Sequence, residues 1–545
     1  IPRFGRLHGD IFIGSPCVIG DSIRAVGGMT IILAVVEAAE TRDMLHMALS
    51  LLASALHKNP KNVHDMRACR GYHLLALFLY RRMALLDLQL LNILFQIAAC
   101  EASFCGTWKL QQNEGMSNIS QASMVTYDHG TMARSPDEFL AFGFLGDLEG
   151  FMEEKDLVNC ISEVESAGLK QQNLNCMVLS NVDMVEHVLL DWTLWATATI
   201  PIQIALLRFL EHLVLMNWYR IHNLAILRQI NLVKYLLITM QRDDIEVTVL
   251  EKLVVLLRSI LGDGFIGSEL ELVVRFVIMS FGPPELAEDH QVRREPMGNH
   301  IIVRNMLLEM LIDLQVAIKS EEVLEQWHRI VSSKLITFFL DEAIHPTSMR
   351  WVMILLGVCL TSSSFSLKFH ISGGFQGLTG ILPSFYDSPE VYYILFCLVF
   401  GKDVYPRLPE VRMLDFHALI PRCLSQNELK FVDLLESVVA MAKTTFDKLS
   451  LEATVACEAG VHSPVSASLT AELAEETKHI GVELQGEALM HKTYAARLMG
   501  GTAEAPAAAA SILRFMVDLA KMCHQFSAIC QRADFLKCCV DLYFS

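Results

Sequence analysis

Apolar residues recur at helical spacing along most of the chain, and the pattern is clearest between Ile301 and Ile318. There the aliphatic residues fall on one stripe of a helix, while Asn305, Glu309 and Asp313 form a separate polar stripe. Ser320 then offers an N-terminal cap for a second helix. The pattern predicts a helix, a short break and another helix.

The next break repeats this arrangement. His345-Pro346-Thr347 interrupts the second helix, and Thr347 is the expected cap of a third helix that runs to Leu360. Short-linked helices in series are the unit of helical-repeat proteins. We therefore predict an all-α fold, an armadillo/HEAT-like α-solenoid.

Similar patterns divide the remaining chain. Thr41 is expected to cap an early helix, and Gly262-Asp-Gly264 and Gly282-Pro-Pro284 are expected stops. Apolar patterning resumes at residues 139–157 and 174–190, and further helices are predicted at residues 204–218, 224–240, 247–261, 429–449, 512–523 and 526–544. Residues 453–481 and 500–510, rich in small residues, are the stretches with the weakest expectation of fixed structure, although their alanines would support frayed helix.

The first 28 residues differ from the rest, because six glycines punctuate short apolar runs. This composition is typical of turns and strands, and predicts the tail of a β-rich module or a β-ribbon packed on the first helices. Since Ile1 is not Met, we expect the chain to be a piece of a longer one. The expected organisation is a β-rich segment (1–28), a first armadillo-like block (29–105), a polar insert (106–135), the main solenoid (136–450), a flexible segment (451–510) and C-terminal helices (511–545).

Composition and charge narrow the classes of protein and of binding partner that fit the chain. The chain is 52% hydrophobic and 19% charged, as buried helices in a stack would require, or as a membrane protein would show. The most apolar window, Trp192–Leu207, is interrupted by Pro201 and favours a buried helix pair over a membrane span. The formal net charge of −17 argues against nucleic acid as a partner of the whole surface, although not against a local basic patch.

The 14 cysteines are scattered, without the short spacings of zinc modules. They are interpreted as small buried hydrophobes in a reducing compartment. The richest ligand-like cluster is Cys523, His524, Cys530, Cys538 and Cys539, and its spacing favours a buried helix face over a metal site. His8, Asp10 and Asp21 lie in the glycine-rich start without a supporting partner spacing.

Catalytic signatures are missing from the sequence. There is no G-x-S-x-G, H-E-x-x-H or P-loop motif, and Gly373-Gly-Phe-Gln-Gly377 lacks the lysine that would follow in a phosphate loop. Asn118-Ile-Ser120 matches a glycosylation sequon, and the Arg81-Arg82 and Arg293-Arg294 pairs are solvated surface or contacts for acidic partners. We predict no catalytic, cofactor-binding or metal-binding residues, and therefore no enzyme.

Several blocks of sequence resemble one family. They are residues 2–14, 182–192, 303–313, 406–412, 487–499 and 513–521. The family that they resemble is that of the large BEACH-domain proteins, which includes the autophagy-linked FYVE protein, and the resemblance covers essentially the whole chain.

The resemblance implies an armadillo-like region that follows a concanavalin-like β domain. In that family the PH-like module, the BEACH domain and the WD40 propeller lie further toward the C-terminus, and we expect none of them in this chain. No site residue is carried over. The implied role is a cytoplasmic, endosome- or vesicle-associated scaffold in membrane trafficking, vesicle dynamics or autophagy.

Two functional hypotheses remain open. In the first, the helical-repeat surface binds protein partners. In the second, the chain is a peripheral membrane-binding module, in which the apolar stretch Trp192–Leu207 or an amphipathic helix touches lipid.

Overall fold

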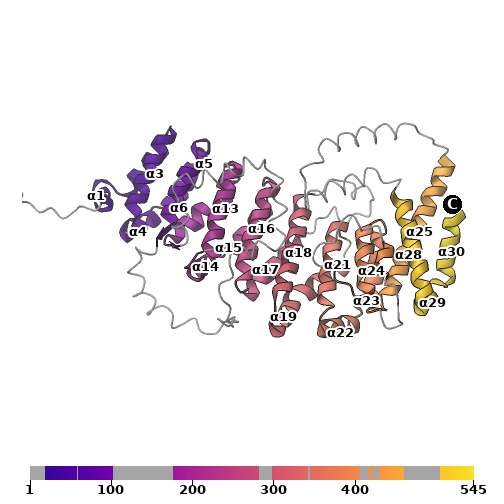
Figure 1. Ribbon diagram of the computed structural model, residues 1–545. Coiled ribbons are helices and arrows are strands. Elements are labelled where there is room, and N and C mark those ends of the chain that lie inside the picture. Colours follow the sequence, from indigo (N-terminus) through magenta and orange to yellow (C-terminus); the bar gives the residue numbers. More distant parts are fainter. Residues whose placement is uncertain are drawn as a thin grey trace, which may run out of the picture. The chain divides into compact units, whose positions relative to one another are not determined.

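A computed structural model describes most of the chain as helices (Figure 1). The described residues form two compact units, one from the N-terminal part to Ile260 and one from Leu261 onward. The predicted all-α, solenoid-like fold is confirmed: among the described residues, strands form a single two-stranded sheet. The structure describes residues 19–57, 59–101, 176–215, 217–280, 298–341, 344–404, 416–420, 429–459 and 504–544.

In the N-terminal unit the helices pack in two ladders. Helix α2 packs on α5, and α5 packs on η4 and α12, while α3 packs on α6 and α6 on α13. The elements are α1 (Ile19–Val26), α2 (Met29–Ala38), α3 (Arg42–Leu56), α4 (Pro60–Ala68), α5 (Gly71–Arg81), η1 (Met83–Leu85), α6 (Leu88–Ala98), α11 (Val182–Met184), η4 (Val185–Leu189), α12 (Trp192–Trp195), α13 (Ile200–Leu215), α14 (Arg220–Gln229), α15 (Leu232–Met240) and α16 (Val247–Gly262).

The C-terminal unit repeats this plan, with α18, α21 and α24 in one ladder and α17, α20, α23 and α25 in the other. The short helices α19 and α22 precede the pairs α20–α21 and α23–α24, as in armadillo repeats. The elements are α17 (Gly267–Met279), α18 (Asn299–Ala317), α19 (Glu321–Trp327), η7 (His328–Ser332), α20 (Ser333–Asp341), α21 (Pro346–Cys359), α22 (Ser363–Ile371), α23 (Gly374–Ile381), η8 (Leu382–Phe385), α24 (Pro389–Val399), η10 (Phe416–Leu419), α25 (Leu434–Ala459), α28 (Glu504–Met522), α29 (His524–Cys530) and α30 (Ala533–Phe544).

Local capping explains many of the helix starts. The Thr41 hydroxyl accepts from the Met44 amide, as predicted. The predicted cap at Thr347 is wrong: His345 is the N-cap of α21, its ring nitrogen accepts from the Thr347 amide, and Pro346 opens the first turn. Ser320 does occupy the N-cap position of α19, although its side chain makes no capping bond.

The predicted β-rich start is wrong for residues 19–26, which form α1. Ile19, Ile23 and Val26 fall four and three residues apart, the spacing of one helix face. Gly27 and Gly28 then end the helix with positive φ angles, and both amides donate to the Ile23 carbonyl. Residues 1–18, which carry the rest of that prediction, lie outside the described residues.

A small antiparallel sheet was not predicted. Strand β1 (Ala99–Glu101) pairs with β2 (Met177–Leu179), with Cys100 opposite Val178. The apolar stretch 174–190 thus contains strand β2, followed by a short α-turn that a π-helical turn continues. Residues 102–175, which include the predicted polar insert and the apolar stretch 139–157, lie outside the described residues.

Several predicted helices have different ends. The stretch 224–240 is two helices, α14 and α15, because Asn231 adopts a left-handed conformation with φ of 58°. The stretch 526–544 divides likewise into α29 and α30. The expectation of weak structure is wrong for residues 453–459 and 504–510, which are helical, in accord with the high helix propensity of alanine.

The polar stripe of α18 lies inside the protein. Asn305 is 1% exposed and Glu309 is 6% exposed, so α18 is not the amphipathic surface helix that its pattern indicates. The helix packs against both α17 and α21, which together cover its polar and apolar sides. Its polar residues must therefore find partners within the fold.

Gly374, the first residue of α23, is expected to tolerate no side chain. A Cβ atom there would lie 2.3 Å from the Phe369 ring, which packs edge-on against Phe375. Gly374→Ala should lower the free energy of unfolding of the C-terminal unit by about 1–3 kcal/mol. Chemical denaturation measures the change.

The matched control lies in the same helix. A Cβ atom added at Gly380 would have no other atom within 4 Å, so Gly380→Ala should raise the free energy of unfolding by about 0.5–1 kcal/mol. Equal effects of the two substitutions would contradict the proposed steric role of Gly374.

Candidate functional site

The cysteine cluster predicted as a helix face lies in the last two helices, α29 and α30, with Cys523 at the N-cap of α29. Burial raises the pKa of Cys530 to about 11 and that of Cys538 to about 12, the latter with help from the nearby Asp447 carboxylate. The Cys538 thiol points to the Lys443 carbonyl oxygen at 3.5 Å. These thiols are protonated near neutral pH and pack as small apolar groups. The described residues contain no group of three or more metal-ligating side chains.

The other predicted candidates are dispersed. Gly373, with φ of 77°, is the N-cap of α23, and Gly374–Gly377 form the first turn of that helix. The glycine-rich stretch that resembled a phosphate loop is therefore mostly helical. Arg81 pairs with Glu37 at 3.8 Å, and Arg82 donates to the Glu37 carbonyl oxygen at the end of α2. Asp21 falls within α1. The outlying candidates His8, Asp10, Asn118–Ser120 and Arg293–Arg294 lie outside the described residues.

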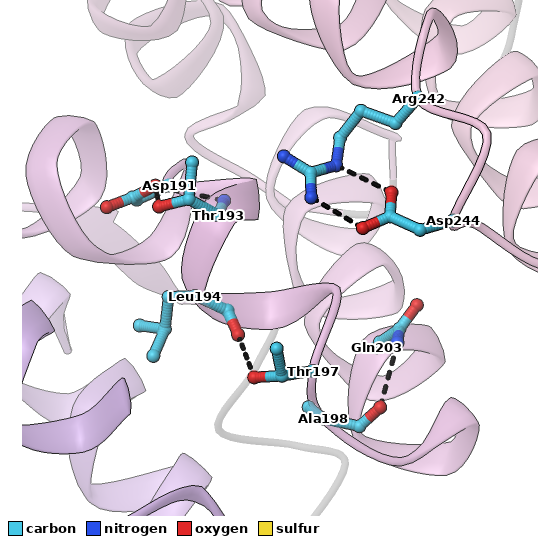
Figure 2. A network of polar contacts seen from close by, with 8 residues as sticks. All are labelled: Asp191, Thr193, Leu194, Thr197, Ala198, Gln203, Arg242 and Asp244. Carbon is cyan, nitrogen blue, oxygen red and sulfur yellow. Dashed lines mark hydrogen bonds and ion pairs between the residues drawn. The ribbon is translucent and has the colours of Figure 1, made fainter. Parts of the chain in front are cut away.

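Polar contacts interrupt the apolar stretch Trp192–Leu207 (Figure 2). Asp191 caps α12 by accepting from the Thr193 amide at 3.0 Å. The Thr197 hydroxyl then donates to the Leu194 carbonyl, and the Gln203 amide donates to the Ala198 carbonyl at 2.9 Å. These bonds stabilise the turn between α12 and α13, so the stretch is two helices.

An ion pair lies beside this turn. Arg242 donates two hydrogen bonds to Asp244, at 2.9 and 2.6 Å (Figure 2). The bonds lower the pKa of the Asp244 carboxyl and raise the pKa of the guanidinium. The Asp191 carboxylate adds to the rise in the pKa of Arg242, which indicates that the start of α12 lies near the turn after α15. Both ion-pair residues are largely solvated, so the pair contributes little stability.

The predicted lipid-facing side of Trp192–Leu207 is wrong, since Trp192, Trp195, Leu206 and Leu207 are buried. Among the described residues, no single helix has the length and apolar character to cross a membrane. Two sharply bent helix pairs meet the criterion only when their residues are combined: Ile200–Leu215 with Arg220–Gln229, and Pro346–Cys359 with Ser363–Ile371.

A buried polar network joins α18 to the start of α21. Arg304 Nε donates to Ser348 Oγ at 3.0 Å, and the same hydroxyl donates to Asn305 Oδ1 at 2.7 Å. Asn305 Nδ2 in turn donates to the Thr347 hydroxyl at 2.9 Å, and the His345 ring lies 2.8 Å from that hydroxyl. The network supplies hydrogen-bond partners for the buried Asn305 of the α18 polar stripe.

A second network lies at the other end of α18, around Gln315. Its Oε1 accepts from Trp327 Nε1 at 3.2 Å and from Ser332 Oγ at 2.9 Å, and its Nε2 points to Cys359 Sγ at 3.3 Å. His328 lies 3.2 Å from the Ser332 hydroxyl. One side chain thus connects α18, α19, the π-helical turn η7 and α21.

His328 is expected to make the C-terminal unit sensitive to acid. Burial lowers the pKa of the imidazole, the Lys368 ammonium lowers it further, and Glu325 opposes both. Because the folded-state pKa lies below the unfolded value of about 6.5, the unfolded state binds the proton more readily as the pH falls. The free energy of unfolding should therefore decrease below about pH 6.5.

The measurement is denaturant unfolding at neutral and at mildly acidic pH. His328→Phe places an apolar ring beside Phe365 and should reduce the decrease. His524→Phe changes an exposed imidazole and should leave the decrease as it is. A decrease of equal size in wild type and His328→Phe would exclude His328 as its source.

Exposed apolar side chains cover the outer side of the first helices. Ile31 and Val35 on α2 and Leu74 and Leu77 on α5 are each about 40% exposed. The two helices pack on each other and run in the same direction, since the ends of both meet at the Arg81–Glu37 pair. We call these four residues the α2–α5 ridge. Sequence patterning assigns such residues to the core, and only the structure reveals their exposure.

Comparison with known proteins identifies the relatives. No family model matches the chain. Over its whole length the chain is 64% identical to part of Protein SPIRRIG and 62% identical to part of BEACH domain-containing protein A2, both from Arabidopsis thaliana. The chain belongs to the family of these BEACH-domain proteins. The resemblance inferred from the sequence blocks is thereby confirmed.

The chain spans only a small part of the length of these relatives. It spans 15% of the length of Spirrig and 16% of that of BEACH domain-containing protein A2. The residues that form the α18 networks lie in the aligned region, as do the α2–α5 ridge and the turn before α14.

Proposed function

We propose that this chain is a non-catalytic scaffold segment of a BEACH-family protein, which binds protein partners through its helical-repeat surface. The α2–α5 ridge is the observation that carries this proposal. Four large aliphatic side chains lie exposed there on two helices that pack on each other. Exposed apolar helix faces of helical-repeat proteins are common binding surfaces for peptides and domains.

Membership of the BEACH family supports a cellular setting for this scaffold. The proposed setting is membrane trafficking, vesicle dynamics or autophagy, in the cytoplasm and at endosomes or vesicles. The buried networks support a structural role for the polar residues, because the hydrogen bonds of Gln315 and Asn305 go to neighbouring helices.

The test compares the wild-type chain with a variant in which Ile31, Val35, Leu74 and Leu77 are serine. Affinity capture identifies candidate partners, and each candidate is then purified and titrated against both proteins. A partner that binds the wild type directly and loses about tenfold or more in affinity for the variant would support the proposal. Partners that bind both proteins equally would place the binding surface elsewhere and contradict the proposed binding role of the α2–α5 ridge.

A further inference from the structure

The turn between α13 and α14 presents a run of exposed large side chains. Trp218 is 77% exposed, Tyr219 is 42% exposed and Ile221 is 65% exposed, with the exposed Arg220 between them. The sequence pattern placed Trp218 at the end of a helix whose large residues were assigned to the core. The other described tryptophans are all at most 4% exposed: Trp192, Trp195, Trp327 and Trp351.

The buried side-chain amide of Asn217 connects the turn to strand β2. Its Nδ2 donates to the Met177 carbonyl in strand β2 at 2.8 Å, and its Oδ1 accepts from the Tyr219 amide at 2.7 Å. Its carbonyl oxygen accepts from the Arg220 amide at the start of α14. The backbone beneath Trp218 is therefore fixed on the sheet.

Asn223 provides a second attachment one turn further along α14. This side chain is fully buried, donates to the carbonyls of Met177 and Leu213, and accepts from the Leu179 amide at 3.0 Å. Because the turn is fixed in advance, little conformational entropy remains to be lost when its side chains meet a binding surface.

The stretch of sequence that follows the turn is basic, whereas the chain as a whole is acidic. No Asp or Glu occurs between Glu211 and Asp243, whereas Arg220, Arg228, Lys234 and Arg242 lie in this interval. Arg220 and Lys234 are exposed, Arg228 is half-buried and donates to the Ile260 carbonyl oxygen, and Arg242 is paired with Asp244. The interval is a basic segment in a chain of formal net charge −17.

We propose that the turn 217–221 anchors this part of the chain on an anionic phospholipid membrane, with Trp218 and Ile221 inserted at the interface. Tryptophan and tyrosine favour the headgroup region of a bilayer, and nearby arginine and lysine are attracted by anionic headgroups. An exposed, rigid turn with this combination of side chains fits a lipid surface. Membrane binding adds to the proposed protein-binding function and does not depend on it.

The test is flotation of the 545-residue chain with vesicles of phosphatidylcholine, with and without phosphatidylserine. Wild type should float with the phosphatidylserine vesicles. The double variant Trp218→Ala/Ile221→Ser should lose about tenfold or more in affinity for these vesicles. The control Leu367→Ser/Ile371→Ser removes side chains of comparable exposure from α22 and should bind like wild type.

A second measurement locates the contact. Vesicles that contain brominated lipids should quench part of the tryptophan fluorescence of wild type, and should quench Trp218→Phe less. Absence of vesicle binding by wild type would overturn the proposal, as would equal binding by wild type and the Trp218/Ile221 variant. The proposal would also be overturned if wild type did not bind vesicles and that variant lost the affinity of wild type for a purified protein partner. That result would assign the turn to protein recognition. The α2–α5 ridge variant should retain vesicle binding, which separates this test from that of the scaffold function.

Discussion

Replacing Asn223 by leucine is expected to lower the free energy of unfolding of the N-terminal unit by about 2–5 kcal/mol. The side chain is fully buried and makes three hydrogen bonds to backbone groups. Leucine has a similar volume but would leave the Leu179 amide and the Leu213 carbonyl without this partner. Met177 would keep its bond from Asn217. A buried backbone group without a partner is destabilising by about 1–3 kcal/mol.

Equilibrium unfolding in denaturant measures the loss, and hydrogen exchange at the Leu179 amide locates it. Gln229→Leu is the matched control, since it makes a comparable change at a more accessible position of the same helix. The control should shift stability by less than about 0.5 kcal/mol. If Asn223→Leu shifted stability no more than Gln229→Leu, the amide would not hold the α13–α14 turn on the sheet. The turn proposed as a membrane anchor would then lack its rigid support.

Local signals in the sequence predicted the helical elements well. The cap at Thr41 and the stop at Gly262 depend only on neighbouring residues, because a hydroxyl near the first amides or a glycine at a helix end acts within one turn. Asn59 with Pro60 opens α4 by the same local chemistry. The all-α prediction followed from such signals together with apolar periodicity.

Features that depend on distant residues could not be predicted. Strand β1 exists because residues 177–179 pair with it across a long separation in sequence. The polar stripe of a helix is exposed when water supplies its hydrogen-bond partners and buried when another helix supplies them. The periodicity of polar and apolar residues in the sequence is the same in both cases. Asn305 is buried because Ser348 and Thr347, more than 40 residues later, supply its partners.

The same argument applies to the candidate surfaces. Trp218 continues the apolar pattern of α13, but Asn217 turns the chain before it and directs the indole outward. The α2–α5 ridge appears in the sequence as ordinary core residues, since α2 is apolar on every side. Family resemblance likewise gave no site residue. The geometry of buried amides and exposed aliphatic residues is what identifies both surfaces.

The buried networks of α18 have a consequence for how the repeats pack. Interhelical polar contacts are satisfied in one register only, whereas aliphatic ridges can slide by a turn at smaller cost. Arg304 and Asn305 fix the start of α21, and Gln315 fixes its end through Cys359. We therefore expect substitutions in these networks to have effects larger than the loss of one hydrogen bond.

Replacing Gln315 by leucine is accordingly expected to lower the free energy of unfolding of the C-terminal unit by about 2–4 kcal/mol. Gln315 is 2% exposed, and its Oε1 accepts from both Trp327 and Ser332. The substitution leaves the buried indole N–H without this acceptor. The Ser332 hydroxyl lies 3.2 Å from the His328 ring nitrogen and can donate there instead, which keeps the expected loss below that of two unpaired donors.

Denaturant unfolding gives the stability change, and tryptophan fluorescence provides a local signal because Trp327 is buried beside Gln315. Gln376→Leu, the same substitution at an exposed position of α23, should change stability by less than about 0.5 kcal/mol. The double variant Gln315→Leu/Trp327→Phe removes the unpaired N–H together with its acceptor, so it should be less destabilised than the sum of the two single variants. Strict additivity would show that the two side chains do not interact, and that α18 and α19 are held together by apolar packing alone.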